Sequence, residues 1–382
     1  MSVVVIAVVL TALVFDFTNG FHDTANAMAT SIASGALRPR VAVLLAGVLN
    51  LVGAFLSVQV ALTISSGLVD EARITPQVIL GGLVGAILWN LLTWLLGLPS
   101  SSSHALFGGL IGATWAVAGS GAIKFSSVVG KVLVPLALSP VVAGLVALAA
   151  TALAYRLAAR GHRRTVHDGF QKAQVVSASM VALAHGTNDA QKTMGVITLT
   201  LVTVGLLPAG SAPPLWVVTA AGLAIAGGTA MGGWRIIRTL GRRVTDVQSP
   251  QGFAAETAST AVILSAAHLG FALSTTQVTT GAVFGSAAGR PAGVVRWRVA
   301  GRMAGVWLLT LPSAAVVGAL AAWVAARGTA GTVLVVAVLV AAAAGIYALS
   351  RRAPVTASTV NAVDVDGAPV LLPVAVPIRA AA

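Results

Sequence analysis

The chain has 382 residues, of which 57% are hydrophobic and only 9% are charged, and its formal net charge is +13. Because a soluble domain carries about 25% charged residues, this composition excludes an ordinary soluble protein and indicates an integral membrane protein. The apolar runs are long and rich in Leu, Ala and Val, which predicts helices and excludes a barrel of short alternating strands. No cysteine is present, so disulfides and thiolate metal sites are excluded.

The first predicted element is the apolar segment 3–34, which exceeds the roughly 20 residues needed to cross a membrane and has a polar motif inside it. We predict a helix that is broken at membrane depth. A helix over 41–64 follows. Residues 76–120 form two apolar runs around a Ser-rich turn with no charge between them, which predicts a re-entrant helical hairpin. A helix over 132–157 completes a first unit, 1–157.

After a basic loop at 158–172, the same kinds of element follow in the same order. The second unit, 173–325, is predicted to contain a broken helix at 173–207, a helix at 215–234, a hairpin at 253–289 and a helix at 303–325. An extra transmembrane helix is predicted at 330–349, and the tail 353–382, rich in Ala, Val and Pro, is predicted to be disordered.

Two polar motifs occur twice each, which indicates a duplicated unit. The motif G-F-H-D-T-A-N at 20–26 is echoed by G-T-N-D-A-Q-K at 186–192, with 166 positions between the two aspartates. A Ser-rich tract at 100–103 is echoed by S-T-T at 274–276, with 173 positions between Ser101 and Ser274. Duplicated units with polar residues at membrane depth are typical of secondary transporters.

The distribution of Lys and Arg predicts the orientation of the chain. With the N-terminus placed outside, 17 of the 23 basic residues fall in inner loops, and only Arg73, Lys124, Lys131 and Arg327 fall in outer ones. This asymmetry agrees with the positive-inside rule, so the basic loops are predicted to be cytoplasmic. The two hairpins then enter from opposite sides. We therefore predict an all-α polytopic protein of the plasma (inner) membrane with two inverted repeats.

The basic residues lie in short loops at helix ends, which suits contact with lipid headgroups and argues against a nucleic-acid partner. Asp23 and Asp189 are the most informative single positions. An ionised carboxylate at membrane depth costs at least about 2.5 kcal/mol, so a bound cation, a proton or a set of donors must offset it. The alternative is that each Asp only caps a half-helix after the break.

Asn26, Asn188 and Gln191 add neutral oxygens near these carboxylates, which suits a hard cation. Lys192 differs from the first unit, which has Asn26 at the matching position. It lies three residues after Asp189 on the same helical face and is predicted to pair with it or to occupy the place of a sodium ion. Extension of Lys192 to the membrane interface is the alternative.

The tracts Ser101, Ser102, Ser103 and Ser274, Thr275, Thr276 each follow a turn and open a helical run. Free N–H groups and a partial positive charge at a helix N-terminus favour an oxyanion, and hydroxyls add donors. An ordinary helix cap is the alternative for either tract alone. Two tracts at matching positions favour oxyanion binding.

Other acidic and imidazole groups also fall inside apolar segments, and three of them are singled out. His22, beside Asp23, is a candidate proton relay, and Glu256 is a further candidate proton site. Asp16 lies seven residues before Asp23 on the same helical face, where it is expected to line an entry path; its counterpart is Ala182. The metalloprotease pattern H-E-x-x-H is absent, and no protein metal site is predicted.

These residues resemble those of the inorganic phosphate transporter (PiT) family, which has a G-x-N-D-x-x-N motif and a P-x-S-[ST]-[ST]-H tract in each of two inverted repeats. The resemblance covers about 1–325. It implies coupled import of inorganic phosphate. By matching position, it assigns Asp23, Asn26 and Asp189 to the coupling-ion and phosphate sites, and the two Ser/Thr tracts to the phosphate oxygens.

Several positions depart from the family pattern. His22 replaces an Asn, Gln191 and Lys192 alter the second motif, Gln277 replaces a His, and Asn50 stands where sodium-coupled members look to have Glu. These changes remove oxygen ligands and add a fixed cation. The resemblance is therefore to bacterial members that use protons, with a neutral metal–phosphate complex as an alternative cargo.

The sequence thus predicts a proton-coupled phosphate symporter that works by alternating access, without a cofactor. Sodium coupling or a sulfate substrate is the alternative within transport. An intramembrane metal-dependent phosphohydrolase and a passive anion channel are the alternatives from other classes. The oligomeric state is not fixed by the sequence, and a homodimer is one of the assemblies left open.

Overall fold

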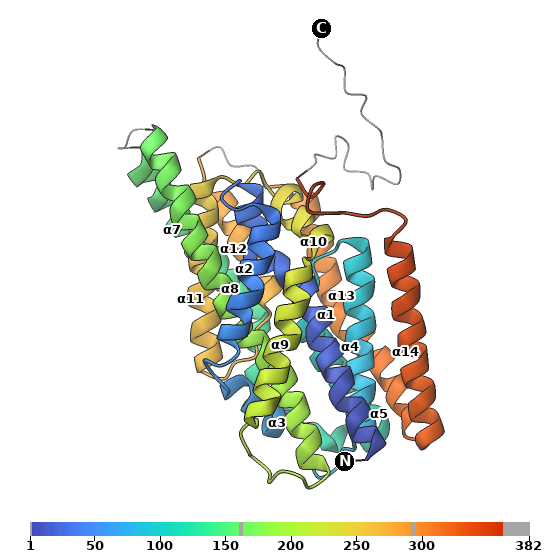
Figure 1. Ribbon diagram of the computed structural model, residues 1–382. Coiled ribbons are helices and arrows are strands. Elements are labelled where there is room, and N and C mark those ends of the chain that lie inside the picture. The colour runs from blue at the N-terminus through green and yellow to red at the C-terminus, as the bar shows by residue number, and fades with distance from the viewer. Residues whose placement is uncertain (1, 160–162, 292–294, 362–382) are drawn as a thin grey trace.

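The computed structural model describes residues 2–159, 163–291 and 295–361. Throughout these ranges the regular structure is helical, and the only pairing of extended backbone is an isolated bridge between Val69 and Ile123. The long helices run in roughly the same direction as one another, with α7 at one edge of the bundle and α14 at the other (Figure 1). The predicted all-α architecture is confirmed.

The first half contains five helices in a row before its last long run. They are α1 (Val3–Ala33), α2 (Pro39–Gly53), α3 (Gln59–Gly67), α4 (Pro76–Leu96) and α5 (Ser102–Ala118). After a short 3-10 turn, η1 (Ser120–Ala122), the last run is made by α6 (Phe125–Val128), the π-helical turn η2 (Val129–Leu133) and α7 (Val134–Ala158).

The second half repeats this order of elements. They are α8 (Arg163–Thr203), α9 (Leu215–Met231), α10 (Trp234–Arg238), the π-helical turn η3 (Thr239–Arg243), α11 (Ser249–His268), α12 (Thr275–Gly289) and α13 (Trp297–Ala325). The helix α14 (Thr329–Ser350) follows. The repeated order agrees with a duplicated chain, whereas the opposite orientation of the two units across a membrane stays a prediction.

The predicted breaks in the two motif-bearing helices are wrong, because α1 and α8 continue as α-helices through both motifs. The motif glycines serve close packing instead. A Cβ on Gly20 would lie 2.3 Å from the carbonyl oxygen of Ile225, and one on Gly186 would lie 2.2 Å from that of Asn50. The polar side chains of the motifs find partners on neighbouring elements, so the helical backbone need not unwind to satisfy them.

Two segments that were predicted as single helices are interrupted. The segment 41–64 is divided between α2 and α3. Within the predicted segment 215–234, helix α9 is capped at Gly232, whose φ of +78° favours glycine. The chain then turns by 59° between α9 and the α10–η3 pair. Hydropathy does not predict these turns, because it indicates whether a segment is buried or lies in lipid and not the direction of the helix axis.

The predicted basic loop 158–172 is largely helical, since α8 begins at Arg163; residues 160–162 lie outside the described ranges. The polar residues 163–172 contain no proline that would interrupt a helix, so α8 begins before the apolar run 173–207. In the predicted disordered tail, residues 353–361 are described, and disorder is wrong for them. The Val360 side chain is 1% exposed and Asn361 donates a hydrogen bond to the Ile32 carbonyl. Residues 362–382 lie outside the described ranges.

Five helical runs in the described ranges are long and apolar enough to cross a membrane, and a sixth is added if the bent α9 and α10–η3 pair is one span. They are α1, α4, the run 125–158, α13 and α14. The outward faces of α7, α13 and α14 expose large apolar side chains such as Leu145, Leu308 and Val340, which suits contact with lipid. The polar motif in α8 keeps that helix out of this set.

Glycines hold each predicted hairpin against a long helix. In α5, a Cβ on Gly112 would lie 2.2 Å from the Ala315 carbonyl oxygen of α13. In α12, a Cβ on Gly285 would lie 1.9 Å from the Gly144 carbonyl oxygen of α7. The two glycines occupy matching repeat positions, so the hairpins α4–α5 and α11–α12 are fixed in equivalent ways. Each long helix thereby helps to position one hairpin tip.

Candidate functional site

The tips of the two hairpins meet inside the bundle. Ser101 begins α5 as its N-cap, and its hydroxyl accepts a hydrogen bond from the N–H of His104. Ser274 begins α12 in the same way and accepts from the N–H of Gln277. The Ser103 hydroxyl donates across the junction to the Leu273 carbonyl, over 2.8 Å. Residues 100–103 and 274–276 are all buried.

Both tips contact the carboxylate of Asp23 on α1. The Ser102 hydroxyl donates to its Oδ2 over 3.0 Å, and the Thr276 hydroxyl donates to its Oδ1 over 3.2 Å. His22 Nδ1 lies 2.6 Å from Oδ1, while His22 Nε2 faces the hydroxyl of Thr93. The carboxylate of Asp23 is therefore surrounded by donors from α1, α5 and α12.

The carboxylate of Asp189 on α8 has a denser set of partners. Lys192 Nζ lies 2.5 Å from its Oδ1, and Asn188 Nδ2 donates to the same oxygen. Its Oδ2 accepts from Asn19 Nδ2 and from the Thr275 hydroxyl, over 3.2 and 3.1 Å. Both charges are fully buried, so the ion pair with Lys192 is strongly held.

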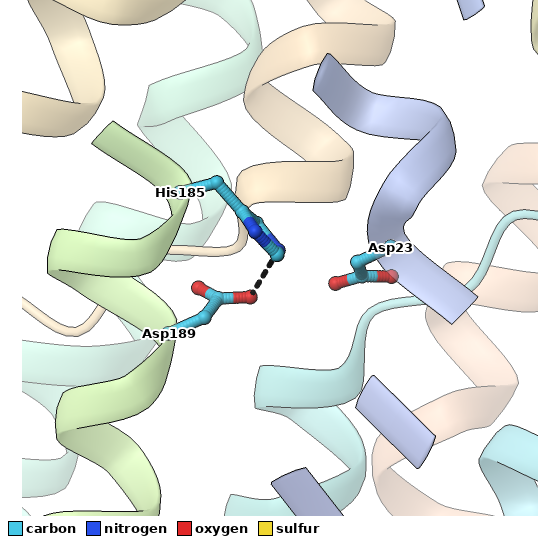
Figure 2. A group of neighbouring side chains, drawn as sticks. All are labelled: Asp23, His185 and Asp189. Carbon is cyan, nitrogen blue, oxygen red and sulfur yellow. Dashed lines mark ion pairs between the residues drawn. The ribbon is translucent and has the colours of Figure 1, made fainter. Parts of the chain in front are cut away.

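Asp23, His185 and Asp189 face one another across the junction of α1 and α8 (Figure 2). One donor atom of each lies within 4.8 Å of the other two, and all three residues are buried. His185 Nε2 is 3.1 Å from Asp189 Oδ2, close enough for an ion pair, although this contact lacks hydrogen-bond geometry. The arrangement brings together the two motif carboxylates, which are 166 positions apart in sequence.

The helix N-termini at the two tips point to anion binding. Helix geometry leaves the N–H groups of the first turn without intrahelical partners, and α5 and α12 both begin at this junction. The Asn26 amide donates to the Thr276 hydroxyl, while its Oδ1 has no hydrogen-bond partner within the described part of the chain. The junction thus offers hydroxyl, amide and backbone donors beside two carboxylates.

Most of the predicted site residues converge here. His22, Asp23, Asn26, Asn188, Asp189 and Lys192 lie at the junction, together with Ser102, Ser103, Thr275 and Thr276. Ser101 and Ser274 lie at the edge as caps, so the cap alternative holds for them, and each hydroxyl hydrogen still can be donated to a ligand.

Two predicted residues lie elsewhere. Gln191 Oε1 accepts hydrogen bonds from the N–H groups of Val60 and Ala61, so it caps the start of α3 instead of facing the carboxylates. Glu256 belongs to a separate buried cluster, in which it accepts hydrogen bonds from Thr30, Gln174 and Ser177. Spacing along a helix predicts which face of the helix a residue lies on, but not which element packs against that face.

The sequence analysis missed Asn19 and His185 as site residues. Asn19 precedes Asp23 by one helical turn, and His185 precedes Asp189 by one turn, so both lie on the faces that the aspartates define. A search for polar residues at this spacing in apolar helices would have found them. Asn50 was noted only as a departure; its amide donates to Thr229 and its oxygen faces His185.

Comparisons with known proteins agree with this geometry. Residues 19–318 match the model of the "Phosphate transporter family". A relative from Mycobacterium tuberculosis, named "Probable low-affinity inorganic phosphate transporter", is 55% identical over 93% of this chain and 86% of its own length. A relative of the same name from Bacillus subtilis is 39% identical over 84% of this chain and 96% of its own.

A solved structure has the same fold. It is titled "The sodium-dependent phosphate transporter", and it matches with a TM-score of 0.77 and 22% sequence identity over 85% of this chain and 99% of that one. The family match and the relatives together cover both motif helices and both hairpins. The chain is therefore a multi-pass membrane protein that belongs to the phosphate transporter family, a family of transporters and not of enzymes.

Proposed function

We propose that this chain imports inorganic phosphate across the plasma (inner) membrane by symport with protons. The observation that carries the proposal is the meeting of both Ser/Thr hairpin tips at the two buried carboxylates, Asp23 and Asp189. Membership of the phosphate transporter family supports phosphate as the substrate. The basic loops would face the cytoplasm, and the two halves would work as inverted repeats.

Phosphate would bind where the hydroxyls now meet the carboxylates. Ser102, Thr275 and Thr276 each donate to an Asp oxygen, so the same hydrogens are available to an anion that enters the junction. The first N–H groups of α5 and α12 would add further donors. A carboxylate can in turn accept a hydrogen bond from the P–OH of monohydrogen phosphate, a proton that sulfate lacks.

Charge balance favours protons as the coupling ion. A phosphate dianion next to two carboxylates is strongly repelled, and Lys192 is already matched by Asp189. Proton uptake at the junction removes the excess negative charge. Lys192 also occupies the position on Asp189 that a sodium ion would need.

The triangle of Asp23, His185 and Asp189 supports a second form of the cargo. Two carboxylates and an imidazole suit a divalent transition metal, and one donor atom of each lies within 4.8 Å of the others. A neutral metal–phosphate complex would then enter as a unit, with its metal facing this triangle and its phosphate oxygens facing the tips. In that case uptake would require the metal as well as phosphate.

The experiment is uptake of labelled phosphate into proteoliposomes with imposed gradients. We expect accumulation with an inward proton gradient and no sodium. Accumulation only with a sodium gradient would contradict proton symport, and equal uptake of labelled sulfate would contradict the selectivity. Flux that equilibrates phosphate but never accumulates it under any gradient would indicate a channel. Repeating the assay with Mg²⁺ or Zn²⁺, or with chelator, separates the two forms of cargo.

Variants of the two carboxylates test the assignment of the site. Asp23→Asn and Asp189→Asn are each expected to abolish accumulation, because each removes a buried carboxylate that accepts a hydrogen bond from a hairpin tip. Asp246→Asn is the matched control, since the Asp246 side chain is 78% exposed and distant in the sequence from both motifs. Normal accumulation by both site variants would refute the assignment.

A further inference from the structure

Asp16 is a buried carboxylate that the proposed phosphate site does not use. It lies on α1, two turns before Asp23, and its exposed fraction is 0%. Both of its oxygens lack a hydrogen-bond partner among the described residues, whereas the oxygens of Asp23 and Asp189 all have donors. A buried carboxylate without donors calls for a ligand, because burial of an unpaired charge is costly.

The neighbours of Asp16 are also short of partners. The Thr193 hydroxyl on α8 faces the Asp16 carboxylate, but among the described residues this contact falls short of full hydrogen-bond geometry, so it holds the carboxylate only weakly. Asn19, one turn along α1, has an unpaired Oδ1. The surroundings of Asp16 therefore offer acceptors and hydroxyls, which suit a positively charged ligand.

Two of the charged groups near Asp16 lie on α8. Asp189 and Lys192 are both within electrostatic reach of it. Lys192 also interacts with His104 on α5, and His22 and Asp23 follow Asp16 on α1 itself. The helices α4 and α9, which also pack on α1, contain no titratable residue. Lys192 is already paired with Asp189, so no cation is left over for Asp16 in this set.

The duplication gives independent support. At the positions that match them, Asp16 has Ala182 and Lys192 has Asn26, so both residues are departures from the repeat. They carry opposite charges, and the fold brings them within reach of each other although they lie on different helices. The first half has an acid without a counterpart, the second half has a base without one, and the fold brings the two near each other, which points to a function that the repeated phosphate-site residues do not supply.

We propose that Asp16 carries the coupling proton, and that Lys192 transmits its charge state to Asp189. This inference rests on the proposed proton symport. When the Asp16 carboxylate binds a proton it becomes a neutral carboxylic acid, and Lys192 stays with Asp189 in the arrangement that the structure has. When Asp16 releases that proton to the other side, its anion competes with Asp189 for the ammonium group of Lys192.

The two states differ by one charge near the phosphate. With the proton bound, Asp16, Asp189 and Lys192 sum to zero, and a phosphate anion is tolerated at the tips. With the proton released, the three groups sum to one negative charge, and Asp189 is less well neutralised beside Thr275. Coulomb repulsion then favours release of the anion, so proton and phosphate leave together.

The test compares two transport assays on the same vesicles. Asp16→Asn resembles a permanently protonated Asp16. It is expected to exchange labelled for unlabelled phosphate across the membrane at a rate near that of the unaltered protein. It is also expected to lose accumulation under a proton gradient, where each pH unit corresponds to about a tenfold concentration ratio per coupled proton. Asp246→Asn should keep both activities.

Each outcome has a distinct meaning. If the unaltered protein does not respond to a proton gradient, proton symport fails and this proposal fails with it. If the unaltered protein responds and Asp16→Asn accumulates phosphate equally well, only the role of Asp16 is overturned. Loss of exchange together with accumulation would also overturn it, because a residue that only carries the proton is not needed for exchange.

Asp16→Glu provides a second, conservative variant. It keeps a titratable carboxyl in the same place with a longer side chain, so coupled accumulation is expected to persist. The pH midpoint of uptake is expected to shift, because the carboxyl now sits at a different distance from Lys192 and Asp189. An unchanged midpoint, or complete loss of accumulation in a protein that still exchanges phosphate, would overturn the proposal.

Discussion

Asp23 and Asp189 occupy equivalent positions in the two halves, yet they are neutralised in different ways. Asp23 contacts the imidazole of His22, and its other partners are hydroxyls. Asp189 pairs with Lys192, a fixed cation, and with two amides. The two halves thus share the frame of the site, whereas their counter-charges differ. The first half places an imidazole beside its carboxylate, and the second half places a permanent positive charge there.

The largest expected effect is on stability, and it separates the two carboxylates. Asp189→Asn leaves the Lys192 ammonium buried without a counter-charge, which we expect to cost about 3–5 kcal/mol of unfolding free energy. Asp23→Asn is expected to cost less, about 1–3 kcal/mol, because His22 can remain neutral. Denaturant titration of both variants in detergent micelles measures the difference. Equal losses would contradict the contrast between the two pairs.

Replacing the fixed cation tests whether Lys192 stands in for sodium. Lys192→Asn gives the second half the residue that Asn26 provides in the first. It removes one partner of a buried ion pair and is expected to reduce sodium-free uptake severely, with a stability loss of roughly 3 kcal/mol. Sodium should restore part of the uptake by binding at Asp189. Lys192→Arg, which keeps the charge, is the control, and sodium-independent uptake by Lys192→Asn would contradict this role.

The packing glycines are expected to be equally intolerant of substitution in both halves. Gly20→Ala and Gly186→Ala each place a Cβ within 2.3 Å of a backbone oxygen, so each should cost about 1–3 kcal/mol of unfolding free energy. Gly345→Ala in α14, where the added Cβ meets open space, is the control and should be neutral or stabilising by about 0.5–1 kcal/mol. A motif glycine that tolerates Ala would argue against the close crossing.

The smallest expected effect concerns the titratable partner. His22→Asn restores the residue that the family motif has at this position and should retain phosphate uptake, since Ser102 and Thr276 still donate to Asp23. The dependence of uptake on pH is expected to become weaker, because the imidazole that contacts the Asp23 carboxylate has been removed. Uptake measured across a series of pH values checks the change. His268→Asn, at an exposed histidine, should leave the pH profile as it was.

Much of this architecture could be predicted from the sequence, because its strongest signals are polar groups whose burial is costly unless they are paired. Carboxylates such as Asp23 and Asp189 inside apolar runs need partners, and repeated offsets indicate which partners belong together. The meeting of the Ser102 and Thr276 tips at Asp23 follows from that logic. Gly112 and Gly285 occupy matching positions in the sequence, but their packing against α13 and α7 appears only in the structure.

The remaining features depend on three-dimensional neighbours. The polar motif at 20–26 was expected to unwind its helix, but partners from α5, α9 and α12 satisfy the side chains and leave the backbone intact. Gln191 lies on a face that meets the start of α3, which no spacing rule indicates. The burial of Val360 depends on a cluster that includes Ile32 and Ile236, far away in the sequence.

The most direct test of a single anion site between the two halves is an experimental structure with phosphate bound. The account predicts phosphate density at the junction of the two hairpin tips, within hydrogen-bond distance of Ser102, Thr275 and Thr276 and beside Asp23 and Asp189. Phosphate bound away from these residues, or contacting the tip of only one hairpin, would contradict it.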